Sequence, residues 1–377
     1  MRTGRGVFLL YLAFSAAVFG YSVLSPIYNW DLLGYVACVG SIRSADANAV
    51  HRYAYDEVRK AVPAATLKVL DPPDGAGYNG VLSSDPEAFA EALPFYRTRV
   101  LYVALVYGLS RLGMNVIMAT HFVSAVSVMV STWLLFLMVR RRVPQPFLLA
   151  LPLLALSFGW LDVSRLSTPD GLSMLGILAC AALYLRSSRW MLVALPMLTL
   201  IRGDLIVFSV PFACLLLILR RFPRSLVLGS LASSIGCYWL IDIWSGHPGW
   251  ATVFYHTLVS RLVHPLSQPV QLTPSEYLRV VGRGLRSVVS SPSMLTFGAI
   301  VTAVAARMSD TRLPSDQTRL VRDEAVLATV AVVYVVLHFA VFPVTWERFY
   351  VGPYLLGAVA LGSLMAGKPS GSFATRF

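Results

Sequence analysis

Long apolar runs separated by short basic clusters are the feature that most constrains this chain. The first run covers residues 7–24 and the last covers residues 351–365. Hydrophobic residues make up 56% of the sequence and charged residues 13%, whereas about 25% of residues are charged in a typical soluble domain. A chain of this composition cannot cover itself with polar side chains, so the sequence predicts a polytopic membrane protein.

The basic clusters predict how the chain is oriented. The net charge is +12, and the arginines stand in short groups between the apolar runs. This distribution is typical of cytoplasmic loops held against anionic lipid, and it excludes nucleic acid as the partner. We therefore expect a multi-pass protein of the plasma (inner) membrane, surrounded by membrane lipid, with both termini in the cytoplasm.

The apolar runs predict an all-α fold, a transmembrane helical bundle with about ten crossings. Residues 190–219 are interrupted at 202–204 and are expected to form a hairpin of two short helices with its charged tip near the outer side. The run 100–110 is shorter than the span of about 17 residues that a crossing needs, so an interfacial helix on the outer face is expected there. The expected spans are 7–24, 116–139, 147–161, 171–185, 190–219 (two short helices), 226–243, 294–306, 325–344 and 351–365.

The chain is expected to form one transmembrane domain over residues 1–366, followed by a short cytoplasmic tail at 367–377. The polar segment 26–98 is expected to be a large, folded first outer loop, and 244–291 a second one. The arginines before the first run resemble the start of a signal peptide. Because no small-residue cleavage site follows them, an uncleaved anchor is expected.

The cysteines have no metal-ligand spacing, and most of them lie inside apolar runs, so they are expected to be small apolar residues. They are Cys38, Cys180, Cys214 and Cys237. No internal repeat of the kind that builds secondary transporters is evident either.

Asp31 lies a few residues after the first apolar run and opens the first polar segment. An acid at this boundary between lipid and water is partly desolvated, yet a substrate that is half lipid and half sugar can reach it. Apolar residues follow Asp31 at once, so a short amphipathic helix is expected to begin there. A catalytic role and an ordinary N-cap role both remain open, since an aspartate cap stabilises a helix by about 1 kcal/mol.

The other singular polar residues also fall on the expected outer side. A charge within the hydrocarbon costs about 2.5–3.5 kcal/mol, so such residues are functional candidates. Asp170 has an alternative explanation as a helix cap, and Arg202 with Asp204 as a structural ion pair at the hairpin tip.

Arg97 and Arg99 have an alternative explanation as interfacial anchors whose long side chains reach the water. Glu347 and Arg348 form a compact acid–base pair at the mouth of two apolar helices. A functional role is favoured for this pair.

The layout of these motifs resembles the GT-C superfamily of polytopic glycosyltransferases, which includes the protein O-mannosyltransferases and the lipid A aminoarabinose transferases. Four short motifs carry the resemblance, which covers most of the chain. They are Trp30-Asp31 with Tyr35, the stretch from Pro94 to Arg99 before the interfacial helix, residues 168–171 through 200–204, and the stretch from Trp346 to Tyr350 before the last span.

The resemblance implies a membrane glycosyltransferase that moves a sugar from a polyprenyl-phosphate donor to a glycan, lipid or protein acceptor on the extracytoplasmic face. It places the general base at Asp31 and a contact with the donor phosphate at Arg348. The further residues expected at the donor phosphate or substrate are Arg97, Arg99, Asp170, Arg202, Asp204 and Glu347. The chain departs from the metal-using members because it has no Asp-x-Asp motif. No metal or other cofactor is therefore predicted, and a bound divalent cation stays open.

The chemistry suits these residues independently of the resemblance. One positioned carboxylate can activate an acceptor nucleophile, which is worth about 10²–10⁴-fold in rate, and a guanidinium fork matches phosphate oxygens in pairs. Three alternatives remain: a lipid-linked polysaccharide polymerase or ligase, a transporter or channel, and a non-catalytic scaffold. A transporter predicts charges spread through the depth of the bilayer. A polymerase or ligase predicts its main outer loop late in the chain, whereas here the largest one comes first.

Overall fold

The computed structural model describes residues 4–309 and 318–366, with side chains up to 309 and again from 323. Apart from an isolated bridge between Ile27 and Leu166, the regular elements in these ranges are helices. The all-α prediction is therefore confirmed for the described part of the chain. The tail expected at 367–377 and part of the basic segment at 307–324 lie outside the described residues.

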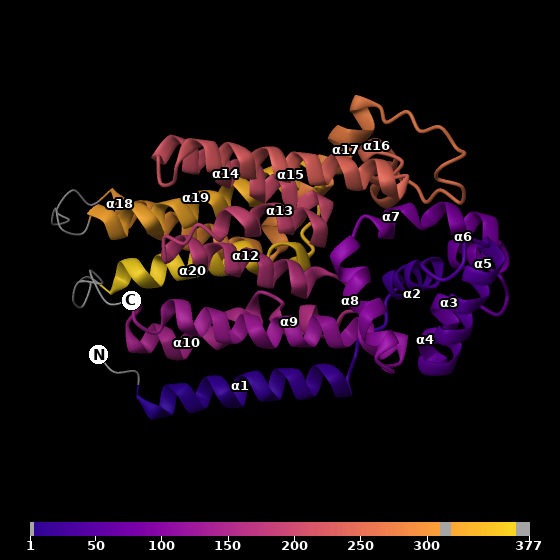
Figure 1. The fold of residues 1–377 in the computed structure, drawn as a ribbon, viewed down its shortest axis with the longest axis horizontal. Helices are drawn as coiled ribbons and strands as arrows, with labels where there is room; N and C mark the ends of the chain where they lie inside the picture. The colour runs from indigo at the N-terminus through magenta and orange to yellow at the C-terminus, as the bar shows by residue number, and fades with distance from the viewer. Residues whose placement is uncertain (1–3, 310–317, 367–377) are drawn as a thin grey trace.

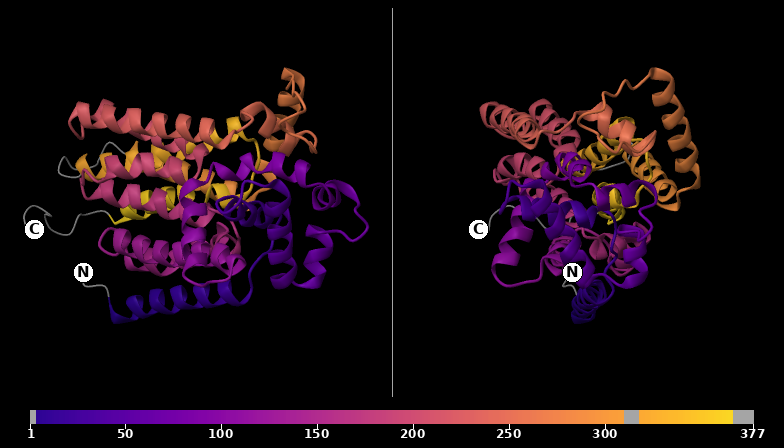
Figure 2. Two further views of the ribbon diagram at one scale, coloured as in Figure 1. Left: turned by 45° about the vertical axis from the view of Figure 1, so that its right-hand side comes forward. Right: turned by 90° about the vertical axis from the view of Figure 1, so that its right-hand side faces the viewer.

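A bundle of helices runs side by side in Figure 1, and Figure 2 shows the same bundle from two further directions. These helices are α1 (Arg5–Leu24), α9 (Val116–Val139), α10 (Gln145–Ser157), α12 (Asp170–Leu185), α13 (Met191–Ile201), α14 (Ile206–Leu219), α15 (Arg224–Ser245), α18 (Pro292–Met308), α19 (Thr318–Val341) and α20 (Val351–Met365).

A second group of helices gathers at one end of this bundle, at the right of Figure 1. They are α2 (Asp31–Ser41), α3 (Ala47–Ala61), α4 (Ala64–Leu70), α5 (Gly77–Ser84), α6 (Pro86–Ala92), α7 (Pro94–Arg97), α8 (Val100–Arg111), α16 (Trp250–Leu258) and α17 (Pro274–Ser290). Three further short helices, α11 (Trp160–Arg165), η1 (Gly203–Leu205) and η3 (Glu347–Phe349), lie between bundle helices in the sequence.

Four of the described helical segments are long and apolar enough to cross a membrane, namely Arg5–Leu24, Val116–Val139, Arg224–Ser245 and Asp323–Val341. A fifth candidate is the pair α17 and α18, which is bent by 76° between Ser290 and Pro292. The remaining apolar helices are shorter, so the expectation of about ten crossings stays a prediction. By length and composition, the described chain is helical and has several helices that could span a membrane.

The segment 190–219 forms the expected helical hairpin. The Ser209 hydroxyl donates to the Leu195 carbonyl at 2.9 Å, which ties α14 back onto α13. Leu195 and Ser209 lie equally far in sequence from Arg202, so the turn lies at the predicted charged tip.

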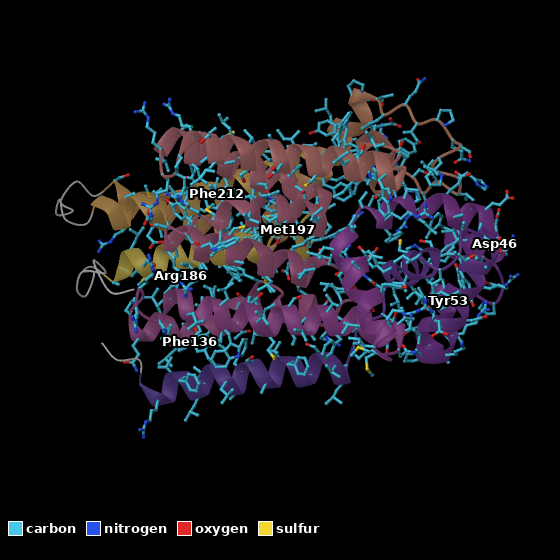
Figure 3. All side chains as sticks on the ribbon, in the orientation of Figure 1. Asp46, Tyr53, Phe136, Arg186, Met197 and Phe212 are labelled. Atoms are coloured by element: carbon cyan, nitrogen blue, oxygen red, sulfur yellow. The ribbon has the colours of Figure 1, made fainter. Side chains whose placement is uncertain are left out.

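The basic ends of several bundle helices meet at one end of the molecule. Arg142, after α9, lies 3.3 Å from the buried carboxylate of Glu324 in α19. Arg221, after α14, lies 3.5 Å from Asp323 in the same helix. Arg186, after α12, lies at this end in Figure 3, whereas Asp46 and Tyr53 lie at the other. The clusters thus share one end, as the charge pattern predicted.

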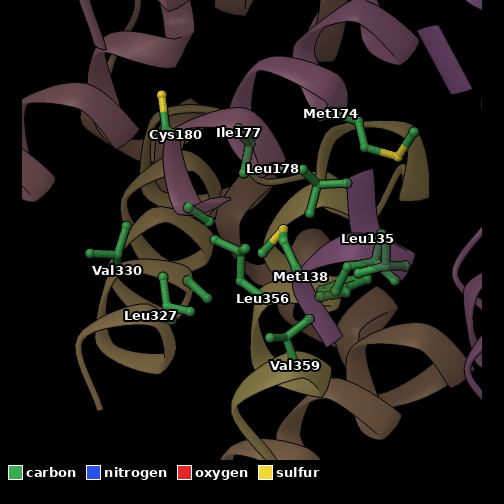
Figure 4. Packing of buried hydrophobic residues seen from close by; sticks show 14 of the residues in the cluster. Leu135, Met138, Met174, Ile177, Leu178, Cys180, Leu327, Val330, Leu356 and Val359 are labelled. Atoms are coloured by element: carbon green, nitrogen blue, oxygen red, sulfur yellow. The ribbon is translucent and has the colours of Figure 1, made fainter. Parts of the chain in front are cut away.

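Helix α20 is the centre of the packing, and nearly all of its residues are buried. Its small residues allow close approach, as is common between membrane helices. At Gly357 a Cβ would press on Phe297, and at Gly362 it would press on Phe147. Figure 4 shows Leu356 and Val359 of α20 among side chains from α9, α12 and α19.

The first polar segment forms its own small core from α2 to α8. Helix α2 begins at Asp31, as expected, but residues 32–40 are all buried. The prediction of an amphipathic α2 is therefore wrong, because helices α3, α7, α8 and α9 contact it on several sides. This enclosure fixes the position of its first residue, Asp31.

Candidate active site

The segment after α1 is hydrogen-bonded to the segment after α11, and this junction positions one side of the site. Ile27 N–H donates to the Arg165 carbonyl at 3.0 Å, and the Arg165 guanidinium donates to the Ser25 carbonyl at 2.6 Å. The bridge pairs Ile27 with Leu166. Residues 29–31 are thereby held beside residues 167–170.

A chain of side-chain hydrogen bonds follows from that junction. The Ser167 hydroxyl donates to the Asn29 side-chain oxygen at 3.0 Å. The Asn29 amide in turn donates to Asp31 Oδ2 at 3.0 Å. Asn29 therefore orients the Asp31 carboxylate.

Asp31 and Arg348 form an ion pair at 2.9 Å between Oδ2 and Nη1, although 317 positions separate them in the sequence. The exposed fractions of the two side chains are 27% and 22%. Nε of Arg348 also lies 3.8 Å from Oδ2 of Asp170. Asp31, the predicted general base, and Arg348, the predicted contact of the donor phosphate, therefore lie together where solvent has partial access.

Neither Asp31 nor Asp170 is a helix cap, so the capping interpretation is wrong for both. The N-cap of α2 is Trp30 and that of α12 is Pro169, and neither helix start has a side-chain cap bond. The Asp170 carboxylate instead accepts a hydrogen bond from the Thr168 hydroxyl at 2.6 Å. Both carboxylates thus face other side chains.

Arg202 links Asp170 to Asp204 in the buried half of the site. Its guanidinium pairs with Asp170 through Nη1 and contacts Asp204 through Nε at 3.0 Å and Nη2 at 2.5 Å. The side chains of Arg202 and Asp170 are only 5% and 3% exposed. The ion pair expected at the hairpin tip is present, and it extends to α12.

His338 and Tyr350 complete this buried half and were missed from the sequence. Nε2 of His338 lies 3.1 Å from Asp204 Oδ2, and Nδ1 lies 3.3 Å from the Tyr350 hydroxyl. The Tyr350 hydroxyl donates its proton to the Val344 carbonyl at 2.9 Å. A signal existed, because an ionisable residue inside an apolar run is a functional candidate by default.

His338 lies between Asp204 and Tyr350, with one ring nitrogen within hydrogen-bond distance of each. The site thus brings three carboxylates together with two guanidinium groups and one imidazole: Asp31, Asp170 and Asp204 with Arg202, Arg348 and His338.

Aromatic rings hold the two arginines. Arg202 lies over the Phe349 ring at 4.5 Å from its centroid, and Arg348 lies 5.1 Å from the same centroid. Arg348 also lies 5.1 Å from the Trp346 ring centroid. These cation–π contacts fix the planes of both guanidinium groups.

In the described part of the chain, the side chains of the remaining predicted residues form no hydrogen bond or ion pair with this cluster. The Glu347 carboxylate accepts a hydrogen bond from Ser293 and packs against Gly159, so the neighbours Glu347 and Arg348 do not act as one pair. Arg99 folds back onto the Phe95 carbonyl and the Thr98 hydroxyl. Arg97 has no hydrogen bond or ion pair among the described residues.

The second outer segment packs against the first one close to Trp30. Trp30 contacts Tyr78 at 6.0 Å between ring centroids, and Tyr78 contacts His256 of α16 at 5.4 Å. The Leu262 N–H donates to His256 Nδ1 at 3.0 Å. Burial, together with the nearby Arg261, lowers the pKa of His256 from 6.5 to about 4.

In the described part of the chain, no group of three or more His, Cys, Asp or Glu residues is placed to hold a metal ion. The arrangement combines a partly exposed carboxylate, a partly exposed guanidinium and a buried charge network that supports them. It can accept a proton at Asp31 and bind an anion at Arg348.

No family model matches this chain, and neither a curated protein nor a solved structure matches it.

Proposed function

We propose that the protein is a membrane glycosyltransferase that moves a sugar from a polyprenyl-phosphate donor to an acceptor at the outer end of the bundle. The observation that carries the proposal is the ion pair of Asp31 with Arg348, partly exposed above a buried charge network. A transferase of this type needs one carboxylate for the acceptor and one cation for the leaving phosphate. Here the Asp31 carboxylate and the Arg348 guanidinium are in direct contact.

The geometry suggests different tasks for the two oxygens of Asp31. Oδ2 accepts hydrogen bonds from both Asn29 and Arg348. Oδ1 has no partner among the described residues, so it can receive the proton of an acceptor hydroxyl. The acceptor oxygen then forms a bond with the anomeric carbon of the sugar.

Arg348 receives the other product of the same step. The bond between the anomeric carbon and the phosphate oxygen breaks, and its electron pair stays on the polyprenyl phosphate. Arg348 can exchange Asp31 for this phosphate, because its side chain is 22% exposed. The exchange also releases Asp31 from its ion pair. Donor binding therefore makes the Asp31 carboxylate a stronger base.

Arg202 is proposed to position the site rather than to touch the donor. Its side chain is 5% exposed and is fully engaged with Asp170 and Asp204. These two carboxylates hold Arg202, and Asp170 also attracts Arg348 from 3.8 Å. Arg97 and Arg99 stay candidates for the outer edge of the donor phosphate.

The proposed setting is the plasma (inner) membrane, with about ten crossings, both termini in the cytoplasm and the site on the extracytoplasmic face. The basic clusters at the opposite end of the bundle support this orientation. The acceptor is a glycan, a lipid or a protein. A transporter is disfavoured because the charges gather at the two ends of the bundle rather than along it.

The test is an assay of the purified, reconstituted protein with a set of polyprenyl-phosphate sugars. Release of polyprenyl phosphate with transfer of the sugar is expected for the wild type and not for Asp31→Asn. The same substitution at Asp323, which is ion-paired at the opposite end, should leave the rate unchanged. Turnover by Asp31→Asn equal to wild type would exclude the proposed mechanism.

A further inference from the structure

Helix α17 presents three different faces around its axis. One face is packed on the protein: Val280 and Gly284 are buried, and the Tyr277 hydroxyl donates to the Ala340 carbonyl at 2.8 Å. A Cβ at Gly284 would collide with the Pro343 carbonyl, so glycine allows this close approach. The helix is therefore held against the end of α19.

A second face of α17 is an exposed apolar stripe. Leu285 lies about two helical turns after Leu278, and Val289 lies about one turn further on. The three side chains therefore lie on the same side of the helix. Their exposed fractions are 65%, 55% and 70%. Exposed leucine and valine side chains in a row mark a surface that contacts something apolar.

The third face is an arginine stripe beside the apolar one. Arg279, Arg283 and Arg286 are exposed and spaced by four and three residues, which places them on one side. The single acid of α17, Glu276, is used in a capping box with Thr273 at the helix start. The stripe therefore carries a net positive charge.

The direction of α17 fits the surface of a membrane. Helix α18 packs among the bundle helices α19 and α20, and α17 is bent by 76° from α18. Because α18 runs along the bundle, α17 lies close to the plane of the membrane surface at the end that carries α2 to α8 (Figure 1). A helix in this plane with an apolar face and an adjacent arginine face is typical of the bilayer interface.

We propose that α17 lies in the membrane–water interface and binds anionic phospholipids. The apolar stripe enters the acyl region, and the arginine stripe binds lipid phosphates, whose oxygens match the guanidinium fork. The occupant is a phospholipid surface because one stripe needs hydrocarbon and its neighbour needs negative charge. The inference is independent of the transferase activity proposed above.

The test compares cysteine labelling at two positions of nearly equal exposure. Leu278 lies on the apolar stripe and is 65% exposed, and Val69 of α4 is 64% exposed at the same end of the molecule. Leu278→Cys and Val69→Cys are made in a chain with Cys214→Ser and Cys237→Ser, which leaves only the buried Cys38 and Cys180. The full-length protein is reconstituted in vesicles of phosphatidylcholine, with or without phosphatidylglycerol.

The rate of reaction with a neutral, membrane-impermeant poly(ethylene glycol) maleimide is measured. Position 278 should react more slowly than position 69, and phosphatidylglycerol should slow it further while leaving position 69 unchanged. Adding Arg279→Gln and Arg286→Gln should remove the effect of phosphatidylglycerol, because each arginine near an anionic surface is worth about 1 kcal/mol, or about 30-fold for two. Arg283 is kept because its guanidinium donates to the Leu258 carbonyl at 2.8 Å.

Arg52→Gln with Lys68→Gln is the matched control, because both residues are exposed on α3 and α4. This pair should leave the effect of phosphatidylglycerol intact. Equal labelling of positions 278 and 69 in every vesicle would overturn the interfacial position. Protection of position 278 that is equal with and without phosphatidylglycerol would overturn the anionic-lipid assignment.

Discussion

Asp31 and Asp170 share the guanidinium group of Arg348. Its Nη1 lies 2.9 Å from Asp31, and its Nε lies 3.8 Å from Asp170. The two carboxylates differ in access, since the side chain of Asp170 is 3% exposed and that of Asp31 is 27% exposed. A substrate phosphate can therefore replace Asp31 at Arg348, while Asp170 stays in place and keeps the guanidinium oriented.

Asp31→Asn should lower the transfer rate by about 10²–10⁴-fold, the usual contribution of a general base. The amide keeps the shape of the side chain but cannot take up a proton. Thermal stability should change by less than about 1 kcal/mol, since a partly exposed ion pair contributes little. The rate and the melting temperature of the same purified sample check both parts.

Arg348→Lys should weaken donor binding while leaving the protein folded and inserted. Lysine keeps the charge, but it loses the fork that can face Asp170 and a phosphate together and the planar contact with Phe349. The measurement is the donor concentration at half-maximal rate. Arg142→Lys is the control, because Arg142 is also ion-paired, is 28% exposed and lies at the other end of the bundle. An unchanged donor dependence in Arg348→Lys would remove Arg348 from the phosphate site.

Part of this site could be predicted from the sequence because some polar residues stand out in an apolar chain. Asp31 and Arg348 each lie beside an apolar run, at the boundary where a charge is costly. The hairpin tip was visible for the same reason, since Arg202 and Asp204 interrupt a long apolar run. The helical class also followed from composition and was confirmed.

The pairing of these residues could not be predicted. Nothing local indicates that Arg348 turns to Asp31 while its neighbour Glu347 turns to Ser293. That division depends on how η3 sits between α11 and α20. Capping stayed an open alternative at Asp31 because the sequence does not show that Asn29 and Arg348 contact its carboxylate.

His338→Leu should destabilise the protein by about 1–3 kcal/mol, because the substitution removes the buried hydrogen bonds that the imidazole makes with Asp204 and Tyr350. Tyr350→Phe should cost less, since it removes one neutral hydroxyl and leaves the contact of His338 with Asp204. Melting temperatures of the two variants in detergent test the order. A smaller loss for His338→Leu than for Tyr350→Phe would contradict a stabilising hydrogen bond between His338 and Asp204.

The docking of α16 and the segment after it onto the first outer segment should become less stable as the pH falls from about 6.5 toward 4. Burial lowers the pKa of His256 from 6.5 to about 4, and Nδ1 must stay unprotonated to accept the Leu262 N–H. In the undocked segment the histidine takes up its proton near pH 6.5, so protonation favours undocking. The stabilisation is fully present above that pH and decreases below it, by at most about 3 kcal/mol at pH 4.

Glu91 acts in the same direction at lower pH. Burial opposes ionisation of Glu91, but hydrogen bonds from Ser267 and Leu266 outweigh that effect and lower its pKa. Hydrogen exchange of residues 259–268 should therefore increase between pH 7 and pH 5 once the intrinsic exchange rate is corrected. His256→Gln keeps an acceptor for Leu262 but cannot titrate, so the increase should be largely absent in that variant. An unchanged pH dependence in His256→Gln would show that other groups control the docking of this segment.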